Sequence, residues 1–147
     1  MKKSIFELLK ACADNKKVDE RVEMLRQAAS RTPAIMQILK YAFDPSIKFL
    51  LPDTDPPYKP TEFLDQEGRL YTELRRLYLF IEGGNPNLSK LKRETLFIQL
   101  LESVHPNDAK LLCSVKNKKL PFKEINSKIT LKAFPGLYSE ESNGQDV

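Results

Sequence analysis

Residues 89–104 read SKLKRETLFIQLLESV, and this stretch decides the class of fold. Its apolar residues recur mainly at three- and four-residue steps: Leu91, Leu96, Phe97, Leu100, Leu101 and Val104. That period is typical of an α-helix, and Asn87 or Ser89 is placed to cap its first turn. The near-continuous apolar content predicts a central, well-buried helix.

The same period appears on both sides of this stretch. It predicts helices over about 4–14, 17–29, 33–43, 67–82 and 107–116, and a last short helix that contains Ile129 and Phe134. Ser4 and Glu7 have the spacing of a capping box, and Asn126 or Ser127 is placed to cap the last helix. No segment alternates convincingly with period two. We therefore predict an all-α fold, an irregular bundle of about seven short helices.

Two segments fall outside the helical pattern. Residues 52–60 hold four prolines and cannot form a helix interior. Residues 138–147 are polar and acidic, and we expect them to be a disordered tail. Residues 1–137 are then predicted to form a single helical domain, with the Pro-rich loop as its major irregular connection.

Composition excludes several classes of protein. The chain has 147 residues, of which 41% are hydrophobic and 30% charged, as in a packed globular protein. No apolar run approaches the roughly 20 residues that a membrane span requires. The two cysteines, Cys12 and Cys113, are too few for a disulfide framework or a zinc site, so two buried free thiols are expected. An intracellular protein without a membrane partner is predicted.

The strongest electrostatic feature lies between residues 110 and 132, which carry seven lysines and one acid, Glu124. Such a concentration suits a polyanion, because each neutralised phosphate releases counterions. A solvated helix face is the alternative explanation. The candidate DNA-binding residues of this segment are Lys116, Lys118, Lys119, Lys123, Lys128 and Lys132.

A second cationic group begins the helix quoted above: Lys90, Lys92 and Arg93. Cations at a helix N-terminus oppose the helix dipole, which indicates a partner that uses them. Two aromatic residues, Tyr58 and Phe122, lie in proline-containing loops beside lysine. They are candidates for binding a partner, although packing of each loop onto the bundle is the simpler interpretation.

Recognisable catalytic chemistry is missing from the sequence. His105, the only histidine, precedes Pro106 at a predicted helix start, where an imidazole usually completes the turn. Gly83-Gly84 lacks the Lys-Ser/Thr of a phosphate-binding P-loop, and no cluster of residues has the spacing of metal ligands. We expect no enzyme activity, no cofactor and no metal.

Two motifs resemble a known family. Residues 41–49, YAFDPSIKF, resemble a segment that ends an early helix in the N-terminal, all-helical DNA-binding domain of small ATP-dependent DNA ligases of the T-even phage type. Residues 132–137, KAFPGL, are similar to the Lys-Val-Trp-Pro-Gly-Leu ending of that domain. The overall chain, including FIEGGNPNL at residues 80–88, resembles a family of uncharacterised small proteins of T-even-like myophages.

The resemblance implies a ligase DNA-binding-domain-like bundle that grips the minor-groove side of nicked duplex DNA through backbone contacts. In some phage systems the ligase domain also touches the sliding clamp. The sequence departs from the family at Leu120–Glu124, where the ligase loop commonly has a glycine, and it has no Lys-x-Asp-Gly motif to accept AMP. Ligation is therefore not expected.

These observations favour a non-catalytic phage accessory protein that binds duplex or nicked DNA through backbone phosphates, without sequence specificity, in the cytoplasm of the infected bacterium. The alternative is a protein–protein interaction module that docks on a viral or host replication or transcription protein. A polymerase subunit or a sliding clamp would be such a partner.

Overall fold

The chain is described by a computed structural model that places residues 3–62 and 66–139. The regular structure in these residues is helical, apart from one isolated antiparallel bridge between Phe49 and Ile81. The all-α prediction is confirmed. The elements are α1 (Ile5–Ala13), α2 (Val18–Arg31), α3 (Ala34–Phe43), α4 (Arg69–Glu73), the 3-10 helix η1 (Leu74–Phe80), α5 (Lys90–Ser103), α6 (Pro106–Lys116) and α7 (Ser127–Ala133).

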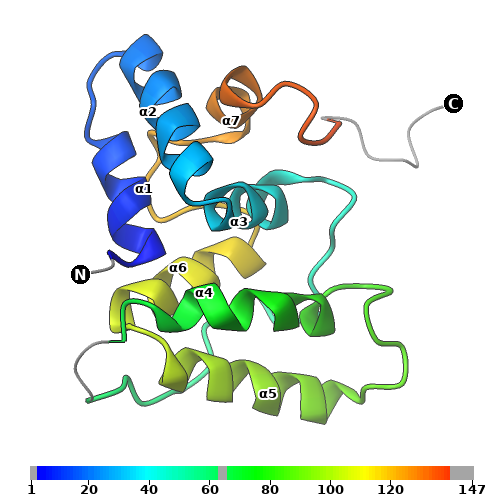
Figure 1. Cartoon of the computed structure of the whole chain (residues 1–147). Coiled ribbons are helices and arrows are strands. Elements are labelled where there is room, and N and C mark those ends of the chain that lie inside the picture. Colours follow the sequence, from blue (N-terminus) through cyan, green and yellow to red (C-terminus); the bar gives the residue numbers. More distant parts are fainter. Residues whose placement is uncertain (1–2, 63–65, 140–147) are drawn as a thin grey trace, which may run out of the picture.

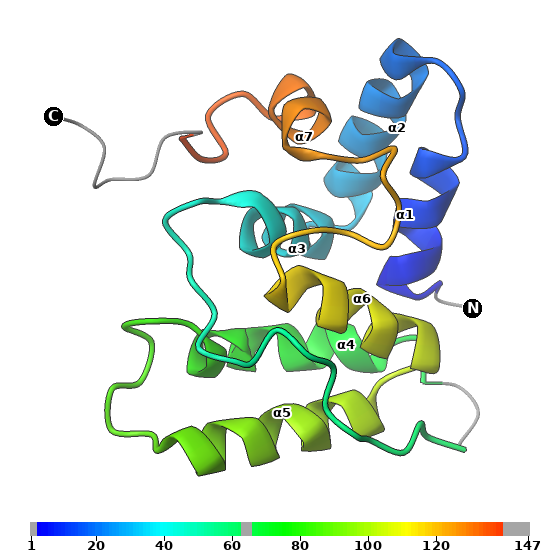
Figure 2. The same cartoon turned by 180° about the vertical axis from the view of Figure 1, so that it is seen from behind.

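The helices are arranged around α6 (Figures 1 and 2). Helix α6 packs against α1 and α3 on one side and α5 on the other. Helix α5 lies alongside α4 and η1 at one end of the molecule, and α7 packs on α2 at the opposite end. The buried apolar side chains of all seven α-helices and η1 join one core.

Helix α5 is peripheral, so the prediction of a central helix over residues 89–104 was wrong. Phe97, Leu100 and Leu101 are buried as expected, but the residue Leu91 is 76% exposed. The central helix is the shorter α6, whose Leu111, Leu112 and Val115 are buried between its neighbours. A helix at the edge of a bundle needs only one apolar stripe. The apolar content of α5 alone does not distinguish a helix at the edge of the bundle from one at its centre.

The single helix predicted over residues 67–82 is divided into α4 and η1. The cause is the spacing of the apolar side chains after α4. Leu74, Leu77 and Phe80 recur every three residues, which matches the three residues per turn of a 3-10 helix. The tighter winding buries Phe80 edge-on against Phe97, with ring centroids 5.3 Å apart, and leaves Ile81 for the bridge to Phe49.

The turn after η1 depends on its second glycine. A Cβ at Gly84 would overlap the backbone carbonyl oxygen of Tyr78, whereas a Cβ at Gly83 meets open space. We expect Gly84→Ala to lower the free energy of unfolding by about 2 kcal/mol, because the backbone must shift to make room. Urea denaturation measures this effect. Gly83→Ala, strained only by its φ of 84°, is the control, and an equal loss in the two variants would contradict the prediction.

Side chains cap four helices as the local sequence suggests. Ser4 and Glu7 form the capping box of α1, and Ser89 accepts a hydrogen bond from the Lys92 N–H at the start of α5. Asn126 caps α7, and the Nδ1 atom of His105 accepts from the Asn107 N–H at the start of α6. The only histidine therefore has a structural role as a helix cap. The two cysteines are buried and free, as predicted.

Two residues of the predicted C-terminal tail, Tyr138 and Ser139, lie among the described residues. The Tyr138 hydroxyl lies 2.7 Å from Ser127 Oγ, so Tyr138 belongs to the folded part and not to the tail. Residues 140–147, the rest of the predicted disordered tail, lie outside the described residues.

Candidate nucleic-acid interface

The connection from α6 to α7, residues 117–126, carries the centre of the lysine-rich segment. Helix α6 ends in a tight turn in which Lys118 has a φ of 64°, and the Lys119 N–H returns to the carbonyl of Ser114. Leu120 and Ile125 are buried in the core, and the Phe122 ring packs on Phe6 with centroids 5.3 Å apart. These apolar residues hold the connection against the bundle and position the lysines between them.

Lys116 is buried and makes structural contacts. Its side chain is 1% exposed, and its ammonium donates to the Asp53 carbonyl at 3.0 Å and to Asn117 Oδ1 at 3.1 Å. Asp55 lies 3.7 Å from the same ammonium. Lys116 therefore fastens the Pro-rich loop to α6, and we remove it from the predicted DNA-binding set.

Lys118 is likewise a structural residue. Its ammonium donates to the carbonyls of Tyr41 at 2.7 Å and Asp44 at 2.9 Å, at the C-terminal end of α3, and lies 5.7 Å from the centre of the Phe49 ring. Burial lowers the pKa of Lys118 to about 8, against the opposing effect of the Asp44 carboxylate. A cation at this position binds the Tyr41 carbonyl of the last turn of α3 and adds a second hydrogen bond to the Asp44 carbonyl, which also accepts the Ile47 N–H.

Lys118→Gln is expected to lower the free energy of unfolding by about 2 kcal/mol, because the change removes charged hydrogen bonds to two carbonyls. Lys119→Gln, at the exposed neighbouring position, is expected to change it by less than about 0.5 kcal/mol. Thermal and urea unfolding of the two variants compare these effects. Equal stabilities would show that the contacts of Lys118 to α3 do not contribute.

Arg93 is the third predicted cation that the fold uses. It is buried, and its guanidinium donates to the carbonyls of Leu79 at 3.2 Å and Leu88 at 3.1 Å. It ties the end of η1 and the following turn to α5. Lys90 and Lys92 are exposed, but α5 lies at the opposite end of the molecule from α7, so they form no common surface with the lysines around α7 (Figures 1 and 2).

Four of the predicted residues between 110 and 132 are not used by the fold. Lys119, Lys123, Lys128 and Lys132 are exposed, and none of them forms an ion pair within residues 3–62 and 66–139. They lie on the α6–α7 connection and on α7. We call these four lysines the cationic surface.

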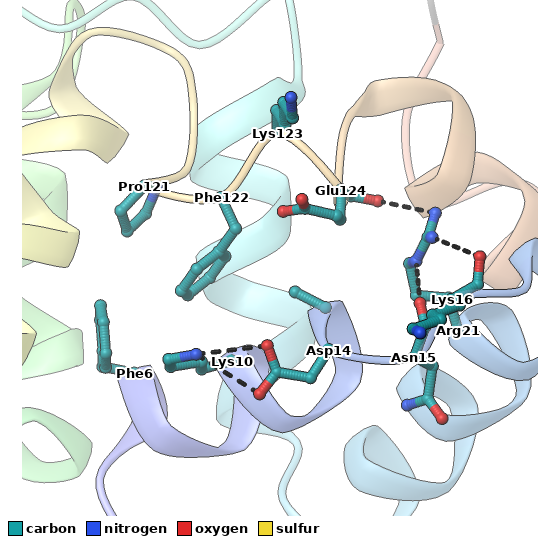
Figure 3. A pocket seen from close by; sticks show the side chains of 11 residues that line it. Phe6, Lys10, Asp14, Asn15, Lys16, Arg21, Pro121, Phe122, Lys123 and Glu124 are labelled. Carbon is teal, nitrogen blue, oxygen red and sulfur yellow. Dashed lines mark hydrogen bonds and ion pairs between the residues drawn. The ribbon is translucent and has the colours of Figure 1, made fainter.

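A groove of about 830 Å³ runs beside this surface, between the α1–α2 turn and the α6–α7 connection (Figure 3). Phe122 points into the groove, and the Lys10–Asp14 pair, 3.2 Å apart, lies on the opposite wall. Lys16 and Lys123 contribute further cations to the lining. The groove therefore has an aromatic floor and a cationic excess over its two acids, Asp14 and Glu124.

Arg21 organises this groove, although its role was not predicted from the sequence. Its guanidinium donates to the carbonyls of Asn15 at 2.9 Å, Lys16 at 3.0 Å and Glu124 at 3.4 Å (Figure 3). Arg26, one turn later on α2, donates to the carbonyls of Lys132 and Ala133 at the end of α7, each at 3.0 Å. Two arginines of α2 thus hold the connection and α7 in place.

The two predicted partner-binding aromatics are both half-buried. Phe122 packs on Phe6, and Tyr58, which belongs to the Pro-rich loop, packs against the core. Burial raises the pKa of Tyr58, with smaller contributions from Cys113 and Asp55. Both loops are packed onto the bundle, as the simpler interpretation of the sequence predicts.

The described part of the chain has neither a cluster of metal-ligating side chains nor an activated thiol. No group of three or more His, Cys, Asp or Glu side chains there is arranged to hold a metal ion. Burial raises the pKa of the thiols of Cys12 and Cys113 to about 11, so neither is an activated nucleophile. No described helix is long and apolar enough to cross a membrane.

Fold and surface together define an all-α protein with an anchored, lysine-bearing connection. Comparison with protein families shows that the chain belongs to a family of unknown function, DUF6433, whose model matches residues 8–121. The match covers α2 to α6 and most of α1, and ends within the α6–α7 connection. No curated protein and no solved structure matches the chain. The resemblance to ligase DNA-binding domains stays a prediction.

Proposed function

We propose that this protein is a non-catalytic DNA-binding module that holds duplex or nicked DNA through backbone phosphates. The observation that carries the proposal is the cationic surface. Its four lysines have no ion-pair partner in the described residues, and they lie on the α6–α7 connection and on α7, both of which pack on the core. Exposed lysines without partners leave a strong local positive potential for a polyanion.

The kind of cation favours contact with phosphate over recognition of bases. Lysine presents a flexible point charge, which suits phosphate oxygens, whereas the guanidinium fork of arginine suits paired contacts to base edges. The arginines nearest the surface, Arg21 and Arg26, are already bound to backbone carbonyls. Contacts of this kind position a protein on DNA without specifying a sequence.

The extent of the surface limits how much DNA it contacts. Lys17 continues the positive charge beyond Lys16 in the groove lining, but Asp19 and Glu20 follow at once in the first turn of α2. With four principal lysines, we expect log K against log salt concentration to have a slope of about −3 to −4. That is a modest footprint, consistent with an accessory role.

The resemblance to T-even phage proteins supports placing the module among phage accessory proteins that act in the cytoplasm of an infected bacterium. A replication or transcription protein with an acidic face, such as a polymerase subunit or a sliding clamp, would use the same lysines. This alternative differs from DNA binding in its ligand, and it favours the Pro-rich loop with Tyr58 as a further contact.

Fluorescence anisotropy of the full-length protein tests the proposal with intact duplex, nicked duplex and single-stranded DNA, each at low and moderate salt. We expect salt-sensitive binding that favours duplex over single strands. Absence of binding to all three DNAs at low salt would overturn the proposal in favour of a protein partner.

A further inference from the structure

A second, smaller hollow of about 260 Å³ lies between α6, the Pro-rich loop and the α6–α7 connection. Side chains from all three segments line it, and those used below are Asp55, Tyr58, Lys110, Ser114 and Lys119. Pro121 borders both this hollow and the groove of Figure 3. We call it the α6 hollow.

Four side chains of the α6 hollow carry hydrogen-bond donors that the fold leaves unused. Lys110 and Lys119 are exposed and form no ion pair with any described residue. Ser114 Oγ and the Tyr58 hydroxyl likewise have no hydrogen-bond partner in the described part of the chain. The raised pKa of Tyr58 keeps its hydroxyl protonated, and therefore a donor, at neutral pH.

The one acidic side chain in the lining is balanced by a cation. Asp55 lies 3.7 Å from the buried ammonium of Lys116. Cys113 also lines the hollow, and because burial raises its pKa to about 11 it adds no negative charge at neutral pH. The charges of Lys110 and Lys119 therefore remain in excess.

We propose that the α6 hollow binds a phosphate group, with Lys110 and Lys119 supplying charge and Ser114 and Tyr58 supplying hydroxyl donors. Two ammonium groups match the roughly two negative charges of a phosphate monoester, and its three terminal oxygens accept the available donors. A free phosphate or nucleotide and the terminal phosphate of a nucleic-acid strand share this chemistry. The proposal does not depend on DNA binding by the cationic surface.

Titration of the full-length protein with inorganic phosphate at constant ionic strength tests the site, followed by amide ¹H–¹⁵N shifts. We expect saturable shifts at residues 110, 114, 117 and 119. Lys110→Gln and Ser114→Ala should each weaken binding, by about tenfold for the lysine, because each removes a donor. Lys92→Gln, an exposed lysine on α5, is the matched control and should leave binding unchanged. Unsaturable shifts spread over all exposed lysines, or unchanged binding in Lys110→Gln, would overturn the proposal.

Short duplexes with a 5′-phosphate or a 5′-hydroxyl distinguish the two sources. Tighter binding of the phosphorylated duplex, lost in Lys110→Gln, would identify the end of a strand as the ligand. Saturable inorganic phosphate binding without any such difference would identify a free phosphate compound. If the unmodified protein binds inorganic phosphate but does not bind duplex DNA, the proposed function is rejected and the phosphate site is retained.

Discussion

Reversing the charge of Lys123, Lys128 and Lys132 to glutamate together is expected to weaken binding of intact duplex DNA at low salt by at least about a hundredfold. Each change removes a cation and adds a repulsive anion at an exposed position that the fold does not use. The slope of log K against log salt should flatten as well, because fewer counterions are released. Anisotropy titrations over a salt series measure both quantities.

A triple variant at the opposite end of the molecule is the matched control. Lys90→Glu, Lys92→Glu and Arg75→Glu change the net charge by the same amount, and all three side chains are exposed on α5 or η1. We expect this variant to lose only the small affinity that follows from net charge. Equal losses in the two triple variants would show that overall charge, and not the cationic surface, determines binding.

Much of the fold could be predicted because its signals are local. Ser4 with Glu7, Ser89 and Asn126 cap helices within three residues of themselves, so their roles follow from spacing alone. The choice between an α-helix and a 3-10 helix after Glu73 is not set by a local signal of this kind. It depends on burying Phe80 against Phe97, a residue on another helix.

The candidate site was predicted less well, because side chains of the same type have different roles. Lys116, Lys118 and Arg93 bind backbone carbonyls, in two cases from residues more than 60 positions away. Sequence did contain a signal for two of them. Arg93 lies four residues before the buried Phe97, and Lys116 four residues after the buried Leu112, so each shares a helical face with the core. Arg21 has the same signal, four residues before the buried Leu25, whereas Lys118 lies beyond the end of α6 and has none.

Asp108 provides a sensitive test of how α1 and α6 meet. It is fully buried in the first turn of α6, and its Oδ1 accepts a hydrogen bond of 2.9 Å from the Phe6 N–H in the first turn of α1. Its Oδ2 has no hydrogen-bond partner in the described residues. Burial raises the pKa of Asp108 to about 6, with smaller raising effects from Glu7 and Glu67, while the Phe6 N–H and His105 oppose the shift.

The raised pKa makes the stability of the protein depend on pH. Between the ordinary pKa of 3.8 and about 6, folded Asp108 holds a proton that the unfolded chain has released. Folding therefore becomes less favourable as pH rises through this window, by up to about 3 kcal/mol from this one carboxyl. This destabilising effect of the ionised Asp108 carboxylate is complete above about pH 6 and absent below the ordinary pKa.

Asp108→Asn is expected to remove that dependence and to raise the free energy of unfolding at pH 7 relative to the unmodified protein, by up to about 3 kcal/mol. An asparagine keeps an oxygen to accept the Phe6 N–H and has no charge to bury. Urea unfolding at several values between pH 4 and pH 7 measures the difference between the two proteins, with the exposed change Asp19→Asn as control. If the difference in free energy of unfolding stays constant across this range, Asp108 does not titrate as its burial implies. If the variant is less stable than the unmodified protein at pH 7, the ionised carboxylate stabilises the contact between the two helix N-termini.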